Sequence, residues 1–227
     1  MERLELRNFG VVKKKIESIV IDAILYTLAI YVLIFLIVYS SAVVYDVSMQ
    51  PTLNKYSAVD KDVVYYNKYA EIERGDIVIV GKGEEEWLIK RVIAFEGEKI
   101  RYQYNSEIGE YQLYLNNRLY EEDYIKESIT RDKLKVENDK YNNFADISDS
   151  SGYNPLSLLK ITQPNSFDDE GNYIVPQGCL FLMGDNRIHS TDSKSMGGIK
   201  NTDIQGVVEL IIPKGENVFW NVINFIF

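Results

Sequence analysis

The sequence predicts a mainly β domain that is preceded by one N-terminal membrane-spanning helix. The first observation is an uncharged, apolar run from Ala23 to Val44, which as a helix is long enough to cross a bilayer core of ~30 Å. The second is a series of β-branched segments, bounded by glycine and proline, in the rest of the chain. A chain of 227 residues has room for one such helix and one domain of ordinary size.

The charges are divided unevenly along the chain. Residues 1–15 hold five bases and two acids, a net charge of +3, and since the whole chain carries −9, the remainder carries −12. An acidic body argues against nucleic acid as a partner, because phosphate binding needs clustered bases. The single cysteine, Cys179, excludes an internal disulfide and a multi-thiolate zinc site. The single histidine, His189, disfavours a histidine-based metal centre or a Ser-His pair.

We divide the chain into a basic lead (residues 1–18), a transmembrane helix (19–44) and an outer domain (45–227). The three lysines at 13–15 place the N-terminus in the cytoplasm, so the domain is expected on the outer face of the plasma membrane. A cleavable signal peptide is the alternative, since Ser40-Ser41-Ala42 provides small residues late in the apolar run. The length of the run favours an uncleaved anchor.

Within the outer domain, the pattern of apolar and β-branched residues predicts strands separated by turns. A hairpin is expected in Lys99–Tyr120, with a turn at Asn116-Asn117. Residues 102–172 form a variable insertion or second lobe, which we expect to be loop-rich from residue 121 onward. The tail Val218–Phe227 is apolar but too short to span a membrane. The predicted strands are Val59–Tyr66, Asp76–Val80, Trp87–Phe95, Tyr173–Met183 and Gly206–Ile212.

Ser48 follows the apolar run almost directly, in the stretch Ser48-Met49-Gln50-Pro51-Thr52-Leu53. Pro51 fixes its own φ and pushes Gln50 into an extended conformation, so the stretch is expected to form a rigid turn. A serine held on such a turn is a candidate nucleophile. Taken alone, the pattern also fits a serine that merely caps or ends the apolar segment, as most serines at such sites do.

Lys90 lies inside the predicted strand Trp87–Phe95, on the face that carries Leu88 and Val92. Its stem could pack on a half-buried strand while the amine reaches water. Alternatively, a desolvated Lys90 would have a lowered pKa, and its neutral amine could act as a general base. A Ser-Lys pair would need no histidine.

The segment after the predicted strand Tyr173–Met183 is dense in small, acidic and hydroxyl residues. Gly184-Asp185-Asn186-Arg187 is followed by Ser190, Asp192, Ser193 and Lys194. This composition is typical of a loop that forms its own hydrogen bonds, with or without a catalytic role.

Four motifs in this order together resemble the type I signal peptidase family, in its bacterial branch with a Ser-Lys dyad (peptidase family S26). The resemblance covers the apolar run and about half of the outer domain, but not residues 102–172. Lys90 separates the chain from the branch that has histidine at this position. The motifs are Ser48-Met49-x-Pro51-Thr52-Leu53, Arg74-Gly75-Asp76-Ile77-Val78, Lys90-Arg91-Val92-Ile93 with Gly97, and Gly184-Asp185-Asn186-Arg187 with Ser190, Asp192 and Ser193.

The resemblance implies a role for several of these residues. Ser48 would be the nucleophile and Lys90 the general base, while Ser190 would orient Lys90. Lys194 stands where arginine is common, so a weaker ion pair is expected there. The scaffold of the site would consist of Arg91, Asp185, Arg187 and Asp192.

The resemblance also implies the fold and the activity. The fold would be an antiparallel β body of the signal peptidase type, with a hydrophobic surface on the membrane. The protein would be a membrane-bound serine endopeptidase that removes signal peptides from exported preproteins, without cofactor or metal. Its partners would be signal peptides and membrane lipid, with no nucleic acid, and its oligomeric state is left open.

Two other functions compete with this one. One is a signal-peptidase-like protein with a narrow substrate range, or an accessory role in the assembly of a surface polymer such as a pilus. The other is a self-cleaving repressor with a Ser-Lys dyad, which the anchor and the acidic body disfavour because DNA binding needs a basic module.

Asp46 departs from the pattern of the resembling family, which often has serine or glycine two residues before the nucleophile. In an extended segment, residues 46 and 48 share a face. An ionised carboxylate ~4 Å from a developing oxyanion would cost about 4 kcal/mol at an effective dielectric near 20. We therefore expect a local kink to turn Asp46 towards solvent or a cationic partner.

Overall fold

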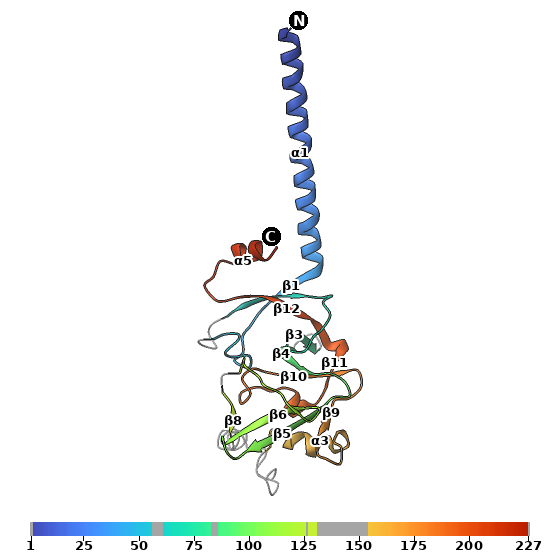
Figure 1. Cartoon of the computed structure of the whole chain (residues 1–227), viewed down its shortest axis with the longest axis vertical. Coiled ribbons are helices and arrows are strands. Elements are labelled where there is room, and N and C mark those ends of the chain that lie inside the picture. Colours follow the sequence, from blue (N-terminus) through green and yellow to red (C-terminus); the bar gives the residue numbers. More distant parts are fainter. Residues whose placement is uncertain (1, 56–60, 83–85, 126, 131–153, 227) are drawn as a thin grey trace. The chain divides into compact units, whose positions relative to one another are not determined.

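The computed structural model describes the whole chain except residues 1, 56–60, 83–85, 126, 131–153 and 227 (Figure 1). The chain divides into two compact units, Met1–Ser40 and Ser41–Phe227. The first consists of helix α1 (Glu2–Val38) and the start of strand β1 (Tyr39–Val43), and the second contains all other elements.

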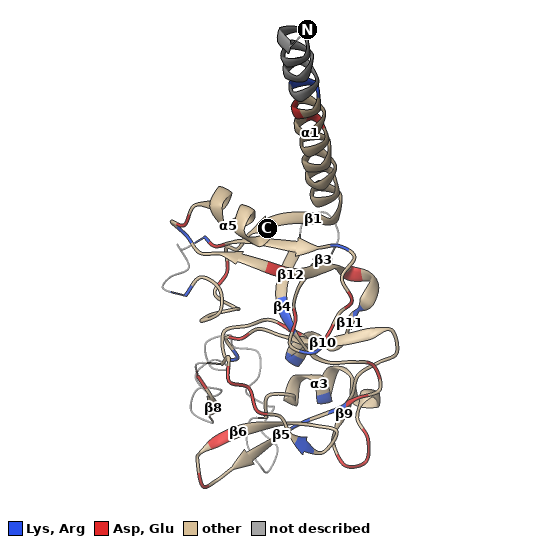
Figure 2. Cartoon of the chain, turned by 45° about the horizontal axis from the view of Figure 1, so that its top comes forward, with Lys and Arg blue, Asp and Glu red and all other residues tan. Residues whose placement is uncertain are grey.

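Helix α1 contains the expected apolar span. Its segment Lys14–Val38 is long and apolar enough to cross a membrane, and none of that segment is buried. Figure 2 shows no charged residue between Ala23 and the end of the helix. The helix includes most of the predicted basic lead and ends at Val38, before residue 44, so the expected boundaries are wrong. Residues 39–43 instead form β1 at the edge of a sheet, where aromatic and β-branched residues are favoured.

The second unit is built on two sheets, the larger of which has seven strands in the order β1-β2-β12-β3-β4-β10-β11. The pairings from β2 to β11 are antiparallel, which confirms the predicted fold class. Because β12 lies between β2 and β3, the last strand of the chain is hydrogen-bonded between two early ones. The strands after β1 are β2 (Val63–Asn67), β3 (Ile77–Lys82), β4 (Glu86–Ala94), β10 (Cys179–Met183), β11 (Ile199–Lys200) and β12 (Ile204–Ile212).

The five predicted strands are present, with one interruption. The predicted strand Tyr173–Met183 is divided into β9 (Tyr173–Ile174) and β10. The division falls at Pro176 and Gly178, because proline cannot donate to a sheet and Gly178 has a positive φ of 70°. The first two residues of the predicted strand Val59–Tyr66 lie outside the described residues.

The smaller sheet is formed largely by Lys99–Tyr120, where the hairpin was expected. Its strands are β5 (Lys99–Asn105), β6 (Glu110–Leu115), β7 (Arg118–Leu119), β8 (Ile129–Thr130) and β9, in the order β7-β6-β5-β9 with β8 paired to β6. The predicted turn at Asn116-Asn117 joins β6 to β7, with both residues in the left-handed region at φ of 50° and 65°.

The loop-rich expectation for residues 121–172 is only partly met. This range contributes β8 to the sheet and also carries helix α3 (Ser157–Thr162) and the 3₁₀ turn η1 (Pro164–Ser166). Alternating tyrosines such as Tyr102 and Tyr111 bury their rings in the core, which is why the hairpin stretch before this range forms a sheet. Residues 131–153 lie outside the described part of the chain.

Two clusters of buried side chains position the site. One joins the smaller sheet to β4 and β10, and within it the rings of Tyr173 and Phe181 lie 5.5 Å apart. The other surrounds the stretch that follows β1, where Met49 and Leu53 are fully buried. The turn that carries Ser48 is thus fixed by apolar residues on both sides of its proline.

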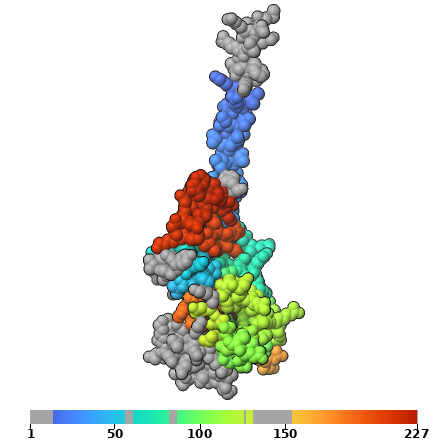
Figure 3. Space-filling model, turned by 60° about the vertical axis from the view of Figure 1, so that its left-hand side comes forward, coloured from blue at the N-terminus to red at the C-terminus, as the bar shows by residue number. Residues whose placement is uncertain are grey.

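The remaining elements follow β10 and β12. Helix α4 (Ser193–Met196) and the 3₁₀ turn η2 (Asn201–Asp203) connect β10 to β12, and helix α5 (Val218–Ile226) ends the chain. The apolar tail is therefore a short helix, in which Phe219 and Trp220 are exposed. Figure 3 shows the surface of β12 and α5 (red) apart from the surface of β5 to β8 (green to yellow).

Candidate active site

The structure brings together the two residues that the sequence singles out for catalysis. The Lys90 Nζ atom lies 2.8 Å from the Ser48 Oγ atom, although the residues are 42 positions apart. Each of the two residues is only 2% exposed. This distance permits direct proton transfer between them.

Ser48 is held by the expected turn. The Gln50 N–H donates to the Val47 carbonyl at 3.0 Å, and the Leu53 N–H donates to the Met49 carbonyl at 2.9 Å. The Gln50-Pro51 peptide bond is cis. The backbone N–H of Ser48 itself makes no hydrogen bond within the described residues, so it is available to a substrate oxygen.

The environment of Lys90 favours its neutral form. Burial lowers the pKa of Lys90 below its ordinary value of 10.5, and the charges of Asp192, Asp46 and Asp185 oppose this effect only in part. Lys90 Nζ also donates to the Ile89 carbonyl at 3.0 Å. The interpretation of Lys90 as a lysine that reaches water is therefore wrong, and the arrangement suits a general base.

The loop that follows β10 supports Ser48 from the other side. The Asn186 N–H donates to the Ser48 carbonyl at 2.9 Å, and Asn186 Nδ2 donates to the Val47 carbonyl at 3.2 Å. A Cβ atom at Gly184 would lie 2.3 Å from both the Ser48 carbonyl oxygen and Ser190 Oγ. Only glycine allows this approach, a requirement that the sequence motif did not reveal.

Asp185 joins the turn, the loop and β4. Its Oδ1 and Oδ2 atoms accept hydrogen bonds from Arg91 Nε at 2.8 Å and Arg91 Nη2 at 2.5 Å. Thr52 Oγ1 donates to the same carboxylate at 2.5 Å. The Arg91 guanidinium also lies 4.0 Å from the centre of the Tyr124 ring. The bidentate ion pair between Arg91 and Asp185 therefore fixes the strand that carries Lys90 and the turn that carries Ser48 to each other.

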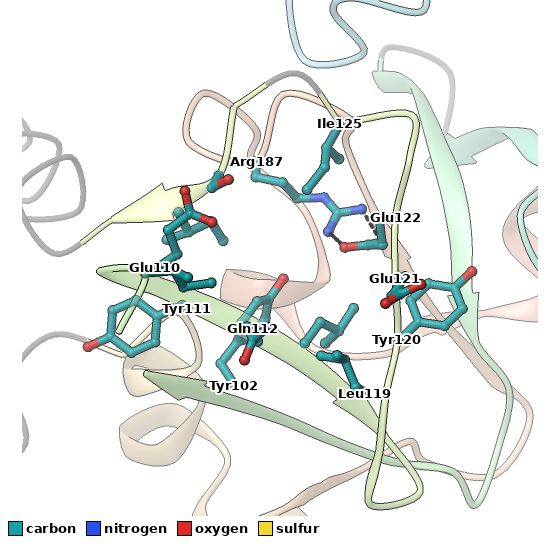
Figure 4. Close-up of a pocket in the computed structure, with 14 residues that line it drawn as sticks. Tyr102, Glu110, Tyr111, Gln112, Leu119, Tyr120, Glu121, Glu122, Ile125 and Arg187 are labelled. Atoms are coloured by element: carbon teal, nitrogen blue, oxygen red, sulfur yellow. Dashed lines mark hydrogen bonds and ion pairs between the residues drawn. The ribbon is translucent and has the colours of Figure 1, made fainter. Parts of the chain in front are cut away.

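Arg187 forms a second buried ion pair, with a partner that sequence reasoning missed. Both nitrogens of its guanidinium head pair with the Glu122 carboxylate (Figure 4), and its Nε donates to the Gly184 carbonyl at 3.0 Å. The pair forms one wall of a cavity of about 220 Å³ beside the smaller sheet. A buried arginine requires a carboxylate, but Glu122 lies in the range that no motif covers.

Asp192 forms the third ion pair. Its carboxylate accepts from the Gly184 N–H at 3.0 Å and from Lys194 Nζ at 2.6 Å. Burial alone would raise the pKa of Asp192, but Lys194 and the backbone N–H groups outweigh it and hold the pKa below its ordinary value. Lys194 makes this contact through one ammonium group, and the weaker pair expected where arginine is common stays a prediction.

The expected contact between Ser190 and Lys90 is not formed. Ser190 Oγ is buried and has no hydrogen-bond partner in the described part of the chain. It lies instead beside Gly184, where a Cβ atom would meet it. The expectation of a Ser190–Lys90 hydrogen bond is therefore wrong for this state of the protein, because the loop holds Ser190 against Gly184.

The Ser48–Lys90 pair lies at the wall of a largely apolar cavity of about 350 Å³. Among the described lining residues, the charged ones are Asp46 and Lys90. Among the described residues, no group of three His, Cys, Asp or Glu side chains is placed to hold a metal ion. The lining consists of Ala42, Val43, Val44, Tyr45, Asp46, Ser48, Val64, Ile79, Trp87, Leu88, Ile89 and Lys90.

Asp46 is exposed, as expected, although it also lines this cavity. Its Oδ1 atom accepts a hydrogen bond from the Val47 N–H at 2.6 Å. Its carbonyl accepts from Asn54 Nδ2 at 3.0 Å, and Asn54 is fully buried. Asn54 is a further residue that sequence reasoning missed, because a single asparagine after a turn carries no distinctive pattern.

Comparisons with known proteins show the family of the chain. Residues 17–213 match the family described as signal peptidase, peptidase S26. The chain is 32% identical over 209 residues to signal peptidase I U of Bacillus subtilis strain 168, covering 90% of this chain and 92% of that protein. It is 30% identical over 208 residues to signal peptidase I P of Bacillus subtilis subsp. natto, covering 88% and 92%.

Among solved structures, a signal peptidase I from Enterococcus faecalis V583 shares 21% sequence identity with this chain. The superposition covers 62% of this chain and 98% of that one, with a TM-score of 0.37.

Gly184→Ala should destabilise the domain strongly, because the new Cβ would overlap the Ser48 carbonyl. We expect the free energy of unfolding to fall by about 1–3 kcal/mol or more, measured by urea unfolding in detergent. Gly81→Ala is the matched control, since its Cβ would meet only the flexible side chain of Gln205 at 3.1 Å. Equal stabilities of the two variants would contradict the close approach at Gly184.

Proposed function

The chain belongs to the signal peptidase family, peptidase S26, and we propose that Ser48 and Lys90 form its catalytic dyad. Members of this family are serine endopeptidases, and the protein removes signal peptides from preproteins. The observation that carries the assignment of the dyad is the buried Lys90 amine, 2.8 Å from the Ser48 hydroxyl at the wall of an apolar cavity.

The reaction begins when the neutral Lys90 amine takes the proton of Ser48 Oγ. The Oγ atom then attacks the scissile carbonyl carbon, and the carbonyl oxygen becomes an oxyanion that the free Ser48 N–H stabilises. The Lys90 ammonium returns the proton to the leaving amine, which departs with the mature protein. Water then attacks the acyl-enzyme ester, with Lys90 again accepting its proton. As the ester bond breaks, the Lys90 ammonium returns that proton to Ser48 Oγ, and the signal peptide leaves as a carboxylic acid.

The cavity is suited to the apolar end of a signal peptide. Apart from Asp46 and Lys90, the part of its lining that the structure describes carries no charged side chain. An extended substrate lying along residues 42–46 would place small apolar side chains in this cavity. Small residues at the first and third positions before the cleaved bond, as the family resemblance implies, would fit a volume of about 350 Å³.

We also propose how the protein is placed in the membrane. The segment Lys14–Val38 would cross the plasma membrane once, with Lys14 and Lys15 at its cytoplasmic end. The catalytic domain would then lie on the outer face, in contact with lipid and with exported preproteins. Basic residues before the span and their absence directly after it support this orientation.

Loss of either member of the dyad should abolish cleavage. Ser48→Ala and Lys90→Met should each lower the rate at least about a thousandfold, and the double variant should lose no more than either single one. The measurement is cleavage of a purified preprotein in detergent, with sequencing of the new N-terminus. Lys68→Met, at an exposed lysine, should retain full activity. Full activity in Ser48→Ala or Lys90→Met would contradict the assignment of the two residues as the catalytic dyad.

Ser190→Ala should give a partial loss. A neutral amine that accepts the Ser48 proton and donates to Ile89 has one N–H left, which Ser190 Oγ could accept once substrate is bound. The rate should fall about tenfold to a few hundredfold. Ser190→Thr, which keeps the hydroxyl, should restore part of the activity. Unchanged kinetics in Ser190→Ala would show that its hydroxyl positions nothing.

Activity should rise with pH through the pKa of Lys90. Only the neutral amine can accept a proton, and burial places the pKa of Lys90 below 10.5. The charged groups acting on Lys90 are Asp192, Asp46, Lys194 and Asp185, and the negative charge of Asp46 raises its pKa. In Asp46→Asn, the rising limb of the profile of kcat against pH should therefore move to lower pH. A profile that falls over this range would exclude a neutral lysine base.

A further inference from the structure

We propose that the Asp46 carboxylate is a subsite for a cationic side chain of the substrate, a lysine or arginine within about three residues of the cleaved bond. The proposal rests on the proposed function of the Ser48–Lys90 pair. It assigns to this chain a substrate preference that the apolar remainder of the cavity cannot supply.

The first argument is the location of Asp46. It lies two residues before the nucleophile and lines the cavity that contains Ser48 and Lys90. Asp46 is exposed, so a substrate in the cavity would meet an ionised carboxylate. Among the described residues of the lining, Asp46 is the one acid, so no other described lining residue duplicates its effect.

The second argument is that the Asp46 carboxylate is held in place but has one oxygen atom without a partner among the described residues. Asn54 holds the Asp46 carbonyl, and the Val47 N–H binds Oδ1. The Oδ2 atom has no hydrogen-bond partner within the described residues. Lys61, on a neighbouring segment, lies with its Nζ 4.5 Å from the centre of the Tyr45 ring and forms no ion pair with Asp46. The protein thus supplies no cation to Asp46 in the part that the structure describes.

The third argument is electrostatic. An unneutralised Asp46 favours the protonated form of Lys90 and opposes the oxyanion on the substrate. A cation carried by the substrate offsets both effects. It also gains an ion pair in a cavity whose apolar walls screen charge less than bulk water does. Basic substrates should therefore be cleaved faster than neutral ones of the same shape.

The test is a scan of the substrate. In a neutral peptide that the enzyme cleaves, lysine replaces one residue at a time from the third position before the cleaved bond to the third after it. For the native protein in detergent micelles, one position should raise kcat/KM about tenfold. Glutamate at that position should lower it, and both effects should weaken as salt is added.

The enzyme variants assign the effect to one side chain. Asp46→Asn should abolish the lysine preference while still cleaving the neutral peptide, and Asp46→Glu should keep it. Asp169→Asn removes an exposed acid outside the cavity and should leave the preference unchanged. The profile of kcat against pH adds a readout that a purely structural role of Asp46 would not change. With the lysine peptide, its rising limb should lie at lower pH than with the neutral peptide in the native protein, but not in Asp46→Asn.

Two results would overturn the proposal. One is a flat lysine scan with the native protein, which would make Asp46 a plain solvated acid. The other is a preference that persists in Asp46→Asn, which would assign it to another group. A failure of the proposed function looks different: cleavage of the neutral peptide would then be absent in the native protein, or present in Ser48→Ala.

Discussion

The rest of the site depends on the burial of one lysine amine. An ammonium group is costly to remove from water, so a buried lysine either has a carboxylate partner or becomes neutral. Lys90 is 2% exposed and forms no ion pair within the described residues. The nearby buried carboxylates are already engaged, Asp185 by Arg91 and Asp192 by Lys194, and Asp46 is exposed. Because these two buried acids have counterions of their own, burial favours the neutral form of Lys90, and a neutral amine is what a base beside Ser48 requires.

The same ion pairs determine where Ser48 lies. Asp185 binds Arg91 of β4 and Thr52 of the turn, so the strand that carries the base and the turn that carries the nucleophile share one carboxylate. Arg187 connects the loop to Glu122 beside the smaller sheet. Buried pairs of this kind are weak evidence for stability but constrain geometry well. The smaller sheet, which lies outside the sequence motifs, is thus part of the support for the dyad.

A feature could be predicted from the sequence where the residues that determine it lie close together along the chain. The span, the strands and the turn at Pro51 follow from composition and periodicity within a few residues, and the structure has them. Ser48 and Lys90 were identified because their motifs are continuous. The end of α1 at Val38 was missed because the pairing of β1 at a sheet edge decides it. Glu122 and the position of Ser190 were missed for a similar reason, since a buried partner far along the chain leaves no local pattern.

Asp46 shows why a residue that looks unfavourable in isolation can persist in such a site. When Ser48 gives up its proton, two charges appear together: a cation on Lys90 and, after attack, an anion on the substrate oxygen. The carboxylate stabilises the first and destabilises the second, so its net effect on the charge-separated state is the difference of two Coulomb terms. At an effective dielectric near 20, a difference between distances of about 5 and 6 Å leaves only about 0.6 kcal/mol. The cost of about 4 kcal/mol expected for the oxyanion alone is therefore mostly cancelled by the lysine, and the remaining cost lies in the protonation of the resting Lys90. A positive charge near Asp46 lowers this remaining cost, because it disfavours the protonated form of the resting Lys90.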